Sequence, residues 1–329
     1  MKRKLPPLFT LPKLLLILTL LLPLACSKKT PTSADERTVP RQGRWGIYAL
    51  NLTTEAVELV YGSSRKIETV RLSRDGNRIV FSHQIDSDDD QDREICTIDV
   101  TGSNYKRITD NDFWDLYPCW SGDDSQIAFL SWRDSTLDIY VMDAADGENQ
   151  RLLYDSGYHD SDLHWWGDQI VFTRNSQIWI MNDDGTNDRQ VTDPPRAGEW
   201  GNANLPFGDY DPRLHPSLPL IVFERLVDDS SPHGNYDLFL INRNGTGETR
   251  LTETGYSQGL ASWCHLGELI VFAVGAIGTE GKYDIYLMNS NGSWNHNITP
   301  DYFPTGFLCH TPIFSRDSSQ IYFVGEWWE

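Results

Sequence analysis

The sequence predicts an all-β fold, a six-bladed β-propeller with four-stranded blades whose last blade is closed by N-terminal strands. Two observations lead to this prediction. A short apolar segment of the type "QIVF" recurs six times along the 329 residues, and a second apolar segment ending in Asp or Asn follows the first five copies. The second segment is missing after the sixth copy, whereas an extra one, "GIYALN", stands before the first. A ring closed by its two ends accounts for both facts.

The six copies of the first segment are expected to form the second strand of each blade. Each gathers Ile, Val, Phe or Tyr in a short run, which is typical of a strand buried on one or both faces. The copies are Arg78–Ser82, Gln126–Leu130, Gln169–Thr173, Leu220–Glu224, Leu269–Ala273 and Gln320–Val324.

The second apolar segment is expected to form the third strand, and tight turns follow it. The copies are Glu94–Asp99, Asp138–Asp143, Gln177–Asn182, Asp237–Asn242 and Asp284–Asn289. After them come "DVTGSN", "DAADGE", "NDDGTN", "NRNGTG" and "NSNGSW". In each of these, Gly after a turn-forming residue supplies the positive φ that a hairpin needs.

The remaining strands complete the blades. First strands contain "PCWS" or its equivalents, and fourth strands contain "KRIT", "QRLLY", "RQVT", "TRLT" and "HNIT". The sixth blade takes its inner strands from Thr311–Ser315 and Gln320–Val324 and its outer strands from Gly46–Asn51 and Glu55–Tyr61. This closure leaves no open sheet edge between the two chain ends.

The repeat "P-x-W-S-x-D", followed by "IAF", "IYVMD", "DG" and "RLT", resembles the repeats of TolB-type propellers. The resemblance covers Gly46 to Phe323. It implies the fold and a binding role, and the expected partner is a protein or a glycan.

The N-terminus predicts export. Residues 1–25 have a basic start, an apolar run from Leu14 to Leu24 and small residues before Cys26, as in a signal peptide. "LPLAC" resembles a lipoprotein cleavage box despite Pro23, so lipid attachment at Cys26 is expected; an ordinary signal peptide and an uncleaved anchor are the alternatives. Ser27 would imply the outer membrane. Residues 26–44 are expected to form a flexible tether and residues 45–329 the propeller.

The charge balance limits the partners. The formal net charge is −19, and without residues 1–25, which contain four basic residues, 24 basic face 47 acidic side chains. Such a surface disfavours nucleic acid and anionic lipid. It leaves basic proteins, cations and neutral glycans.

The loops that connect successive blades contain the candidate binding residues. Asp115, Asp160 and Asp209 stand at equivalent positions, with Gln258 next in the series, and Trp114 lies beside Asp115. We expect these five to recognise a partner around the mouth of the central channel. The alternative is that the aspartates cap backbone amides of the loops.

Metal binding and catalysis form the second hypothesis. His159, His164 and His310, with His215, are expected to lie in connecting loops on one face, and the related oligogalacturonate lyases build a manganese site from histidines on such a ring. Asp86, Asp88 and Asp90 alternate like carboxylates of a calcium loop, but Gln91 and Thr97 replace the Gly and Glu of an EF-hand. We therefore expect a non-catalytic binding propeller without a cofactor, calcium being the alternative ligand. A metal-dependent polysaccharide-processing enzyme is the alternative function.

Four cysteines follow Cys26, at Cys96, Cys119, Cys264 and Cys309. In an exported chain they could form disulfides in three connectivities, or remain as buried free thiols.

Overall fold

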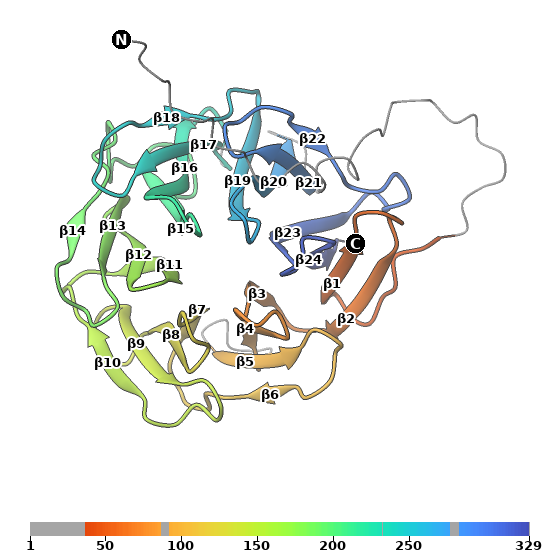
Figure 1. The fold of residues 1–329 in the computed structure, drawn as a ribbon, viewed down its shortest axis with the longest axis horizontal. Helices are drawn as coiled ribbons and strands as arrows, with labels where there is room; N and C mark the ends of the chain where they lie inside the picture. The colour runs from red at the N-terminus through yellow and green to blue at the C-terminus, as the bar shows by residue number, and fades with distance from the viewer. Residues whose placement is uncertain (1–36, 87–91, 232, 277–282, 329) are drawn as a thin grey trace, which may run out of the picture. The chain divides into compact units, whose positions relative to one another are not determined.

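The computed structural model describes residues 37–86, 92–231, 233–276 and 283–328, which lie in one compact unit, Arg37–Glu329. Within these residues the strands form six four-stranded antiparallel sheets arranged as a ring (Figure 1). The all-β, six-bladed fold is therefore confirmed.

The first three blades each use four consecutive strands. Blade one comprises β3 (Ile67–Leu72), β4 (Arg78–Gln84), β5 (Arg93–Asp99) and β6 (Lys106–Arg107). Blade two comprises β7 (Asp115–Trp120), β8 (Gln126–Ser131), β9 (Asp138–Asp143) and β10 (Arg151–Tyr154). Blade three comprises β11 (Asp160–Trp166), β12 (Gln169–Arg174), β13 (Gln177–Asn182) and β14 (Arg189–Gln190).

The last three blades include the composite one. Blade four comprises β15 (Asp209–Leu214), β16 (Leu220–Asp228), β17 (Asn235–Asn242) and β18 (Thr249–Arg250). Blade five comprises β19 (Tyr256–Trp263), β20 (Leu269–Ala276), β21 (Tyr283–Asn289) and β22 (His296–Asn297). Blade six comprises β23 (Phe307–Phe314), β24 (Gln320–Trp327), β1 (Trp45–Asn51) and β2 (Val57–Ser63).

The ring closes in blade six, as predicted. The strand order is β2-β1-β24-β23, and β1 pairs with β24 without a register shift, from Trp45 opposite Glu326 to Asn51 opposite Gln320. Figure 1 shows the red and orange N-terminal strands beside the blue C-terminal ones. Both chain ends thus share one sheet.

The repeated Phe of the second strand fills the spaces between blades. Its six copies are all fully buried: Phe81, Phe129, Phe172, Phe223, Phe272 and Phe323. Each joins an apolar cluster with residues of the preceding blade; Phe172, for example, shares its cluster with Leu130 and Val141 of blade two. One such cluster between each pair of blades explains why this residue recurs.

Tryptophan also links neighbouring blades. Trp120 Nε1 donates to the backbone oxygen of Arg71 in blade one, and Trp263 Nε1 donates to that of Arg213 in blade four, both at 3.1 Å. The expected packing role of these tryptophans agrees with their burial.

The threonine that ends four of the fourth-strand repeats has a structural role as well. The hydroxyl oxygens of Thr109, Thr192, Thr252 and Thr299 each accept the backbone N–H at the equivalent position of the third strand, at 2.7–3.0 Å. The fourth strands are short, so this side-chain bond extends their pairing.

The segment preceding β1 differs from the expected tether. Val39 is 7% exposed and packs into the apolar cluster of blades five and six, and Arg44 forms a 2.7 Å ion pair with Glu326. Residues 37–44 therefore lie against the ring, because their one apolar side chain finds a place in its core. The predicted signal peptide and the lipid-attachment residue Cys26 lie outside the described residues.

The four cysteines in the propeller are buried free thiols, which is one of the two expected alternatives. Across the part of the chain that the structure describes, no helix has the length and apolar character needed to cross a membrane.

Candidate binding site

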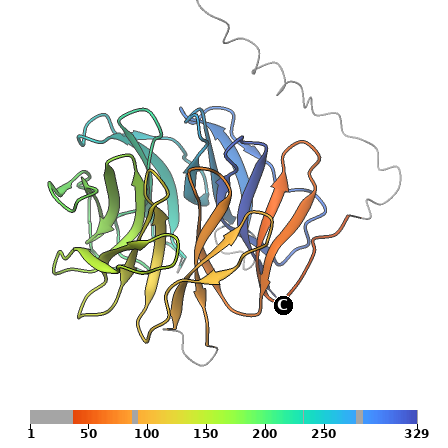
Figure 2. The same cartoon turned by 60° about the horizontal axis from the view of Figure 1, so that its bottom comes forward.

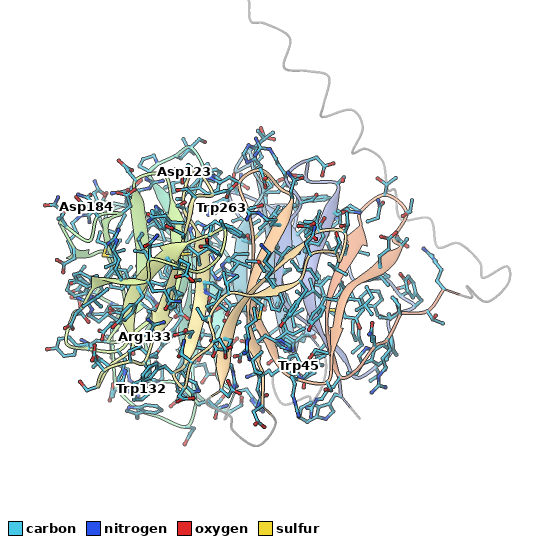
Figure 3. All side chains as sticks on the ribbon, turned by 90° about the horizontal axis from the view of Figure 1, so that it is seen from below. Trp45, Asp123, Trp132, Arg133, Asp184 and Trp263 are labelled. Carbon is cyan, nitrogen blue, oxygen red and sulfur yellow. The ribbon has the colours of Figure 1, made fainter. Side chains whose placement is uncertain are left out.

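The loops of the propeller form two distinct faces (Figure 2). We call the connector face the one that contains the loops between successive blades and the loops between second and third strands. The turn face contains the tight turns of each blade. Figure 3 shows Trp45, Trp132 and Arg133 at the connector face, and Asp123, Asp184 and Trp263 toward the turn face.

The three predicted binding aspartates begin the innermost strands of blades two, three and four, but their side chains lie inside the protein. Asp115, Asp160 and Asp209 are each 0% exposed. Arg225 donates to Asp209 through hydrogen bonds of 2.5 and 2.9 Å, and Arg174 Nε donates to Asp160 at 2.8 Å. These carboxylates therefore join the first and second strands of their blades.

Asp115 is held by hydrogen bonds in a similar way, but the arginine beside it lies farther from the carboxylate. It accepts hydrogen bonds from Ser131 Oγ at 2.5 Å and Asn111 Nδ2 at 2.8 Å, and Arg133 lies at 3.4 Å. The expected position of the three aspartates, exposed around the channel mouth, is thus corrected. Their recurrence reflects the satisfaction of buried polar groups within each blade.

Gln258 and Trp114, the other two predicted residues, occupy different environments. Gln258 replaces the aspartate in blade five, is 2% exposed and donates to the backbone oxygen of Tyr256 at 2.6 Å. Trp114 lines a cavity on the connector face, and its ring meets that of Trp132 edge-on at 5.5 Å. Of the five, Trp114 is the one positioned to meet a ligand.

This connector cavity has a volume of about 500 Å³ and is built from the innermost strands of five blades together with β1 and β24. Aromatic rings of Trp45, Trp114 and Tyr117 line it. Its polar lining includes two pairs, Arg93 with Glu68 at 2.8 Å and His310 with Glu326 at 3.4 Å, together with Lys66, Arg71 and Asp211. The cavity combines apolar surface with balanced charge, which suits binding of a polar partner rather than chemistry on one.

Other segments of the connector face contain exposed aromatic side chains. The connector-face segments contain Phe113, Trp132, Tyr158, Trp200, Tyr256 and Trp328, with exposed fractions from 38% to 69%. Among the described residues, the exposed aromatics of the turn segments are Tyr105 and Trp294. Aromatic side chains gathered on one face are typical of an interaction surface.

Each innermost strand bends at the same place, and most of the residues at these bends line the connector cavity. In every blade, the residue two positions after the one equivalent to Asp115 has a positive φ of 45–58°. These residues are Thr69, Tyr117, Asp162, Asp211, Leu260 and Thr311. The register with the second strand shifts at this bulge in every blade. Each such residue costs on the order of 1–3 kcal/mol, so the surrounding sheet must enforce the bend.

The bulges bring an acidic cluster together inside the ring. Asp211 N–H donates to Asp162 at 3.4 Å, and Leu260 N–H donates to Glu224 at 2.7 Å. Gly259 permits this approach, because a Cβ there would overlap the Glu224 carboxylate. Burial, followed by the charge of Asp211, raises the pKa of Asp162 to about 6 and that of Glu224 well above its usual value.

The three candidate metal-binding histidines do not come together. His310 lines the connector cavity, His159 lies on the surface against Trp132, and buried His164 lines a cavity on the turn face. His164 takes this position because it follows the bulge of β11, and Leu214 N–H donates to its Nδ1 at 3.0 Å. The expectation that the histidines share one face is therefore wrong.

Within the described ranges, no three His, Cys, Asp or Glu side chains are grouped as metal ligands. Asp86 is exposed, whereas Asp88 and Asp90 lie outside the described residues, so the calcium alternative stays a prediction.

Because several buried carboxylates have a raised pKa, we expect the free energy of unfolding to depend on pH. Burial also raises the pKa of Asp160 to about 6. A raised pKa means that the folded state binds more protons than the unfolded one, so the free energy of unfolding falls as pH rises from about 4 to about 7. Below this window, stability falls again as carboxylates with lowered pKa, such as Asp123 at about 2, become protonated.

Urea denaturation across this pH range measures the effect. Glu224→Gln, which is neutral at every pH, is expected to flatten the slope, and Glu253→Gln, at an exposed position, is expected to leave it unchanged. Stability that rises steadily from about pH 5 to about pH 7 would contradict this account.

Comparisons with known proteins agree with the architecture. The TolB beta propeller domain family matches residues 39–199. An uncharacterized protein of Agrobacterium fabrum is 27% identical over 146 residues, which cover 42% of this chain and 45% of that protein. The match thus spans less than half of the relative's length.

Solved structures extend the likeness to the whole ring. A structure assigned to TolB from Agrobacterium tumefaciens superimposes with a TM-score of 0.67 and 15% identity, covering 87% of this chain and 99% of that one. TolB from Acinetobacter baumannii gives 0.53 and 15%, covering 87% and 64%. An oligogalacturonate lyase in complex with manganese gives 0.51 and 12%, covering 88% and 99%. At these identities the likeness establishes the fold alone.

The chain is thus a six-bladed β-propeller that is similar to the TolB beta propeller domain family over residues 39–199. The resemblance predicted from the repeats is confirmed.

Proposed function

We propose that this propeller is a non-catalytic binding module of the bacterial cell envelope that recognises a protein partner through its connector face. The observation that carries the proposal is the set of exposed aromatic side chains on the connector face, led by Trp200 at 69% exposure. Tryptophan and tyrosine dominate the binding energy of protein interfaces when a partner covers them. A glycan that stacks on the same rings is the alternative partner.

The paired charges of the connector cavity support recognition over catalysis. Glu68 is paired with Lys66 and Arg93, and Glu326 is paired with Arg44. A carboxylate that accepts charge-assisted hydrogen bonds keeps its negative charge and is a poor general base. The net charge of −19 further favours a partner with a basic surface.

Export and lipid attachment at Cys26 complete the proposal, supported by the sequence of residues 1–26. A lipid on Cys26 would hold the propeller close to a membrane, where its partner would be expected. Mass spectrometry of the mature N-terminal peptide tests the proposed lipid attachment, because it shows whether Cys26 carries a lipid.

The alternative, a metal-dependent enzyme acting on polysaccharide, has less support. His159, His164 and His310 lie in three separate places, and the likeness to the manganese-containing lyase is one of fold.

Replacement of the exposed tryptophans tests the binding role. We expect Trp132→Ala combined with Trp200→Ala to weaken the partner complex by about thirtyfold or more, because a buried hot-spot residue contributes about 2 kcal/mol or more. The full chain serves as bait for envelope extracts, and the captured partner is then titrated by calorimetry.

Trp294→Ala is the matched control, since Trp294 is 47% exposed on the turn face. Equal affinity of the double variant and the wild type would overturn the connector-face proposal.

A further inference from the structure

A second cavity lies toward the turn face of the ring, and Arg71 lines both this cavity and the connector cavity. It opens among the turns between first and second strands, and its volume is about 110 Å³. Since water occupies about 30 Å³ in the liquid, this space suits a group the size of a few water molecules. We call it the arginine cavity, lined by Arg71, Arg74, Arg213, Arg316, His164 and His265 together with Trp166 and other residues.

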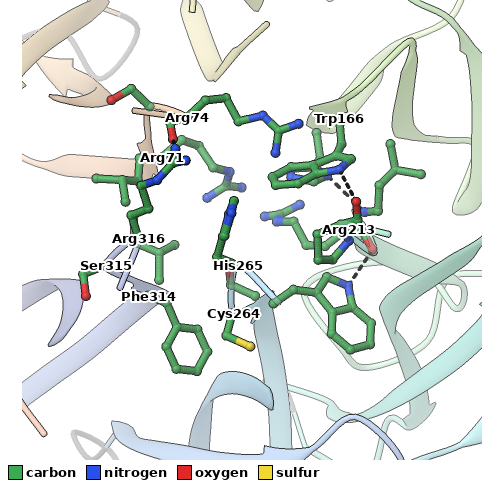
Figure 4. A pocket seen from close by; sticks show the side chains of 17 residues that line it. Arg71, Arg74, Trp166, Arg213, Cys264, His265, Phe314, Ser315 and Arg316 are labelled. Carbon is green, nitrogen blue, oxygen red and sulfur yellow. Dashed lines mark hydrogen bonds between the residues drawn. The ribbon is translucent and has the colours of Figure 1, made fainter. Parts of the chain in front are cut away.

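Positive charge in this cavity contrasts with the acidic chain. Its four arginines come from blades one, four and six, so the ring closure itself assembles them. Among the described residues that line the cavity, none is Asp or Glu. Figure 4 shows the guanidinium groups of Arg71 and Arg213 and the ring of His265 pointing toward the same space, with Arg74 beside Trp166.

The hydrogen bonds of Arg71 leave donors unused. Arg71 is 7% exposed, and its Nη1 donates to the backbone oxygen of Val70 at 2.8 Å, but its buried Nε has no partner among the described residues. Burial, followed by the positive charge of Arg213, lowers the pKa of Arg71 to about 9. The charges of Asp211 and Asp162 oppose this shift, but among the described residues neither carboxylate accepts a hydrogen bond from Arg71. A buried guanidinium with unused donors is suited to bind an anion.

Nearby carboxylates offset only part of the charge. Arg213 Nη2 pairs with Asp211 at 3.0 Å, and Asp124 accepts the backbone N–H of Arg74 rather than its guanidinium. Glu224, the next acid, has a pKa raised well above its usual value, by burial first and then by the charge of Asp211. Arg316 donates to the backbone oxygen of Arg74 and therefore adds charge without cancelling it.

We propose that the arginine cavity binds a doubly charged oxyanion of the phosphate type, either free phosphate or the phosphate group of a small ester. Guanidinium groups present paired N–H donors that match the oxygens of such an anion. A dianion balances several unpaired guanidinium groups better than a single carboxylate does.

Isothermal titration calorimetry of the full chain with inorganic phosphate at low ionic strength tests the proposal. We expect saturable binding at one site. Arg71→Gln and, separately, Arg74→Gln are each expected to weaken it about tenfold or more, since each removes a charge-assisted hydrogen bond. Arg151→Gln removes one positive charge from an exposed position on β10 and is expected to leave the affinity unchanged.

Sulfate, of the same charge and shape, should compete with phosphate, and acetate should bind more weakly. Glycerol 3-phosphate in place of phosphate distinguishes the two sources: tighter binding supports an ester ligand, and equal or weaker binding supports the free ion. No saturable phosphate binding, or binding that both cavity variants retain at full strength, would overturn the proposal. Unfolding curves of the variants without phosphate verify that they fold.

Discussion

Phe172→Ala is expected to lower the free energy of unfolding by about 3–5 kcal/mol, the range for a phenylalanine truncated in a close-packed core. Phe172 is 0% exposed and contributes to the apolar cluster between blades two and three, with Leu130, Val141 and Trp165. The ring depends on such contacts because adjacent blades meet through side chains, not through a continuous sheet. Denaturation by urea, monitored by tryptophan fluorescence, measures the loss.

Two further variants make the result specific. Phe172→Leu keeps most of the volume and should cost less than about 1.5 kcal/mol. Phe113→Ala, at a residue that is 40% exposed on the connector face, should change stability by no more than about 0.5 kcal/mol. Equal losses for Phe172→Ala and Phe113→Ala would contradict the assignment of this phenylalanine to the space between blades.

Arg225→Ala is expected to destabilise the protein by about 3–5 kcal/mol, because it leaves a buried charge without its partner. Arg225 holds Asp209, which is 0% exposed, and also donates to Glu248 through two bonds of 2.8 Å. Burial already raises the pKa of Asp209, so in the variant this carboxyl takes up a proton more readily. The loss should therefore shrink as the pH is lowered and this carboxyl becomes protonated.

The double variant Asp209→Asn with Arg225→Ala separates charge from packing. If the unpaired carboxylate causes the loss, the double variant should recover about half of it or more, whereas purely lost packing would make the two effects additive. Arg151→Ala, on the exposed outer strand of blade two, is the control and should have little effect.

The fold could be predicted because the repeat contains its determinants. The phenylalanine of "QIVF" fills the inter-blade space in every copy, and the glycines of the turns stand where positive φ is needed, as at Gly102 and Gly245. The missing third strand of the last repeat and the extra "GIYALN" specified the closure. The packing of residues 37–44 could not be predicted, since Val39 is a single apolar residue in a polar stretch.

The positions of the candidate site residues could be predicted less well from the sequence. The sequence alone does not show whether an aspartate at the start of an innermost strand faces solvent or a buried arginine. Asp209 and Arg225 are 16 residues apart in the sequence, and the fold brings their side chains together. His164 was assigned to the wrong face because the strand continues beyond the bulge at Asp162 before reaching it. The repeated bulge itself occurs at residues as different as Thr69 and Leu260, so composition gave no signal.

The arginine cavity could not be predicted from the sequence either, because the fold brings its residues together. Arg71 and Arg213 occupy equivalent places four residues after Ile67 and Asp209, a spacing that the sequence contains. Arg74 and Arg316 belong to turns of different blades, and the closed ring alone places all four together.

Site-specific photo-crosslinking in cells of the source bacterium tests the central claim, recognition through the connector face, most directly. A benzophenone amino acid replaces Trp200, 69% exposed on the connector face, or Trp294, 47% exposed on the turn face. The account predicts a discrete adduct with one partner protein from position 200 and none from position 294. Adducts from position 294 alone, or no adduct from either, would contradict it.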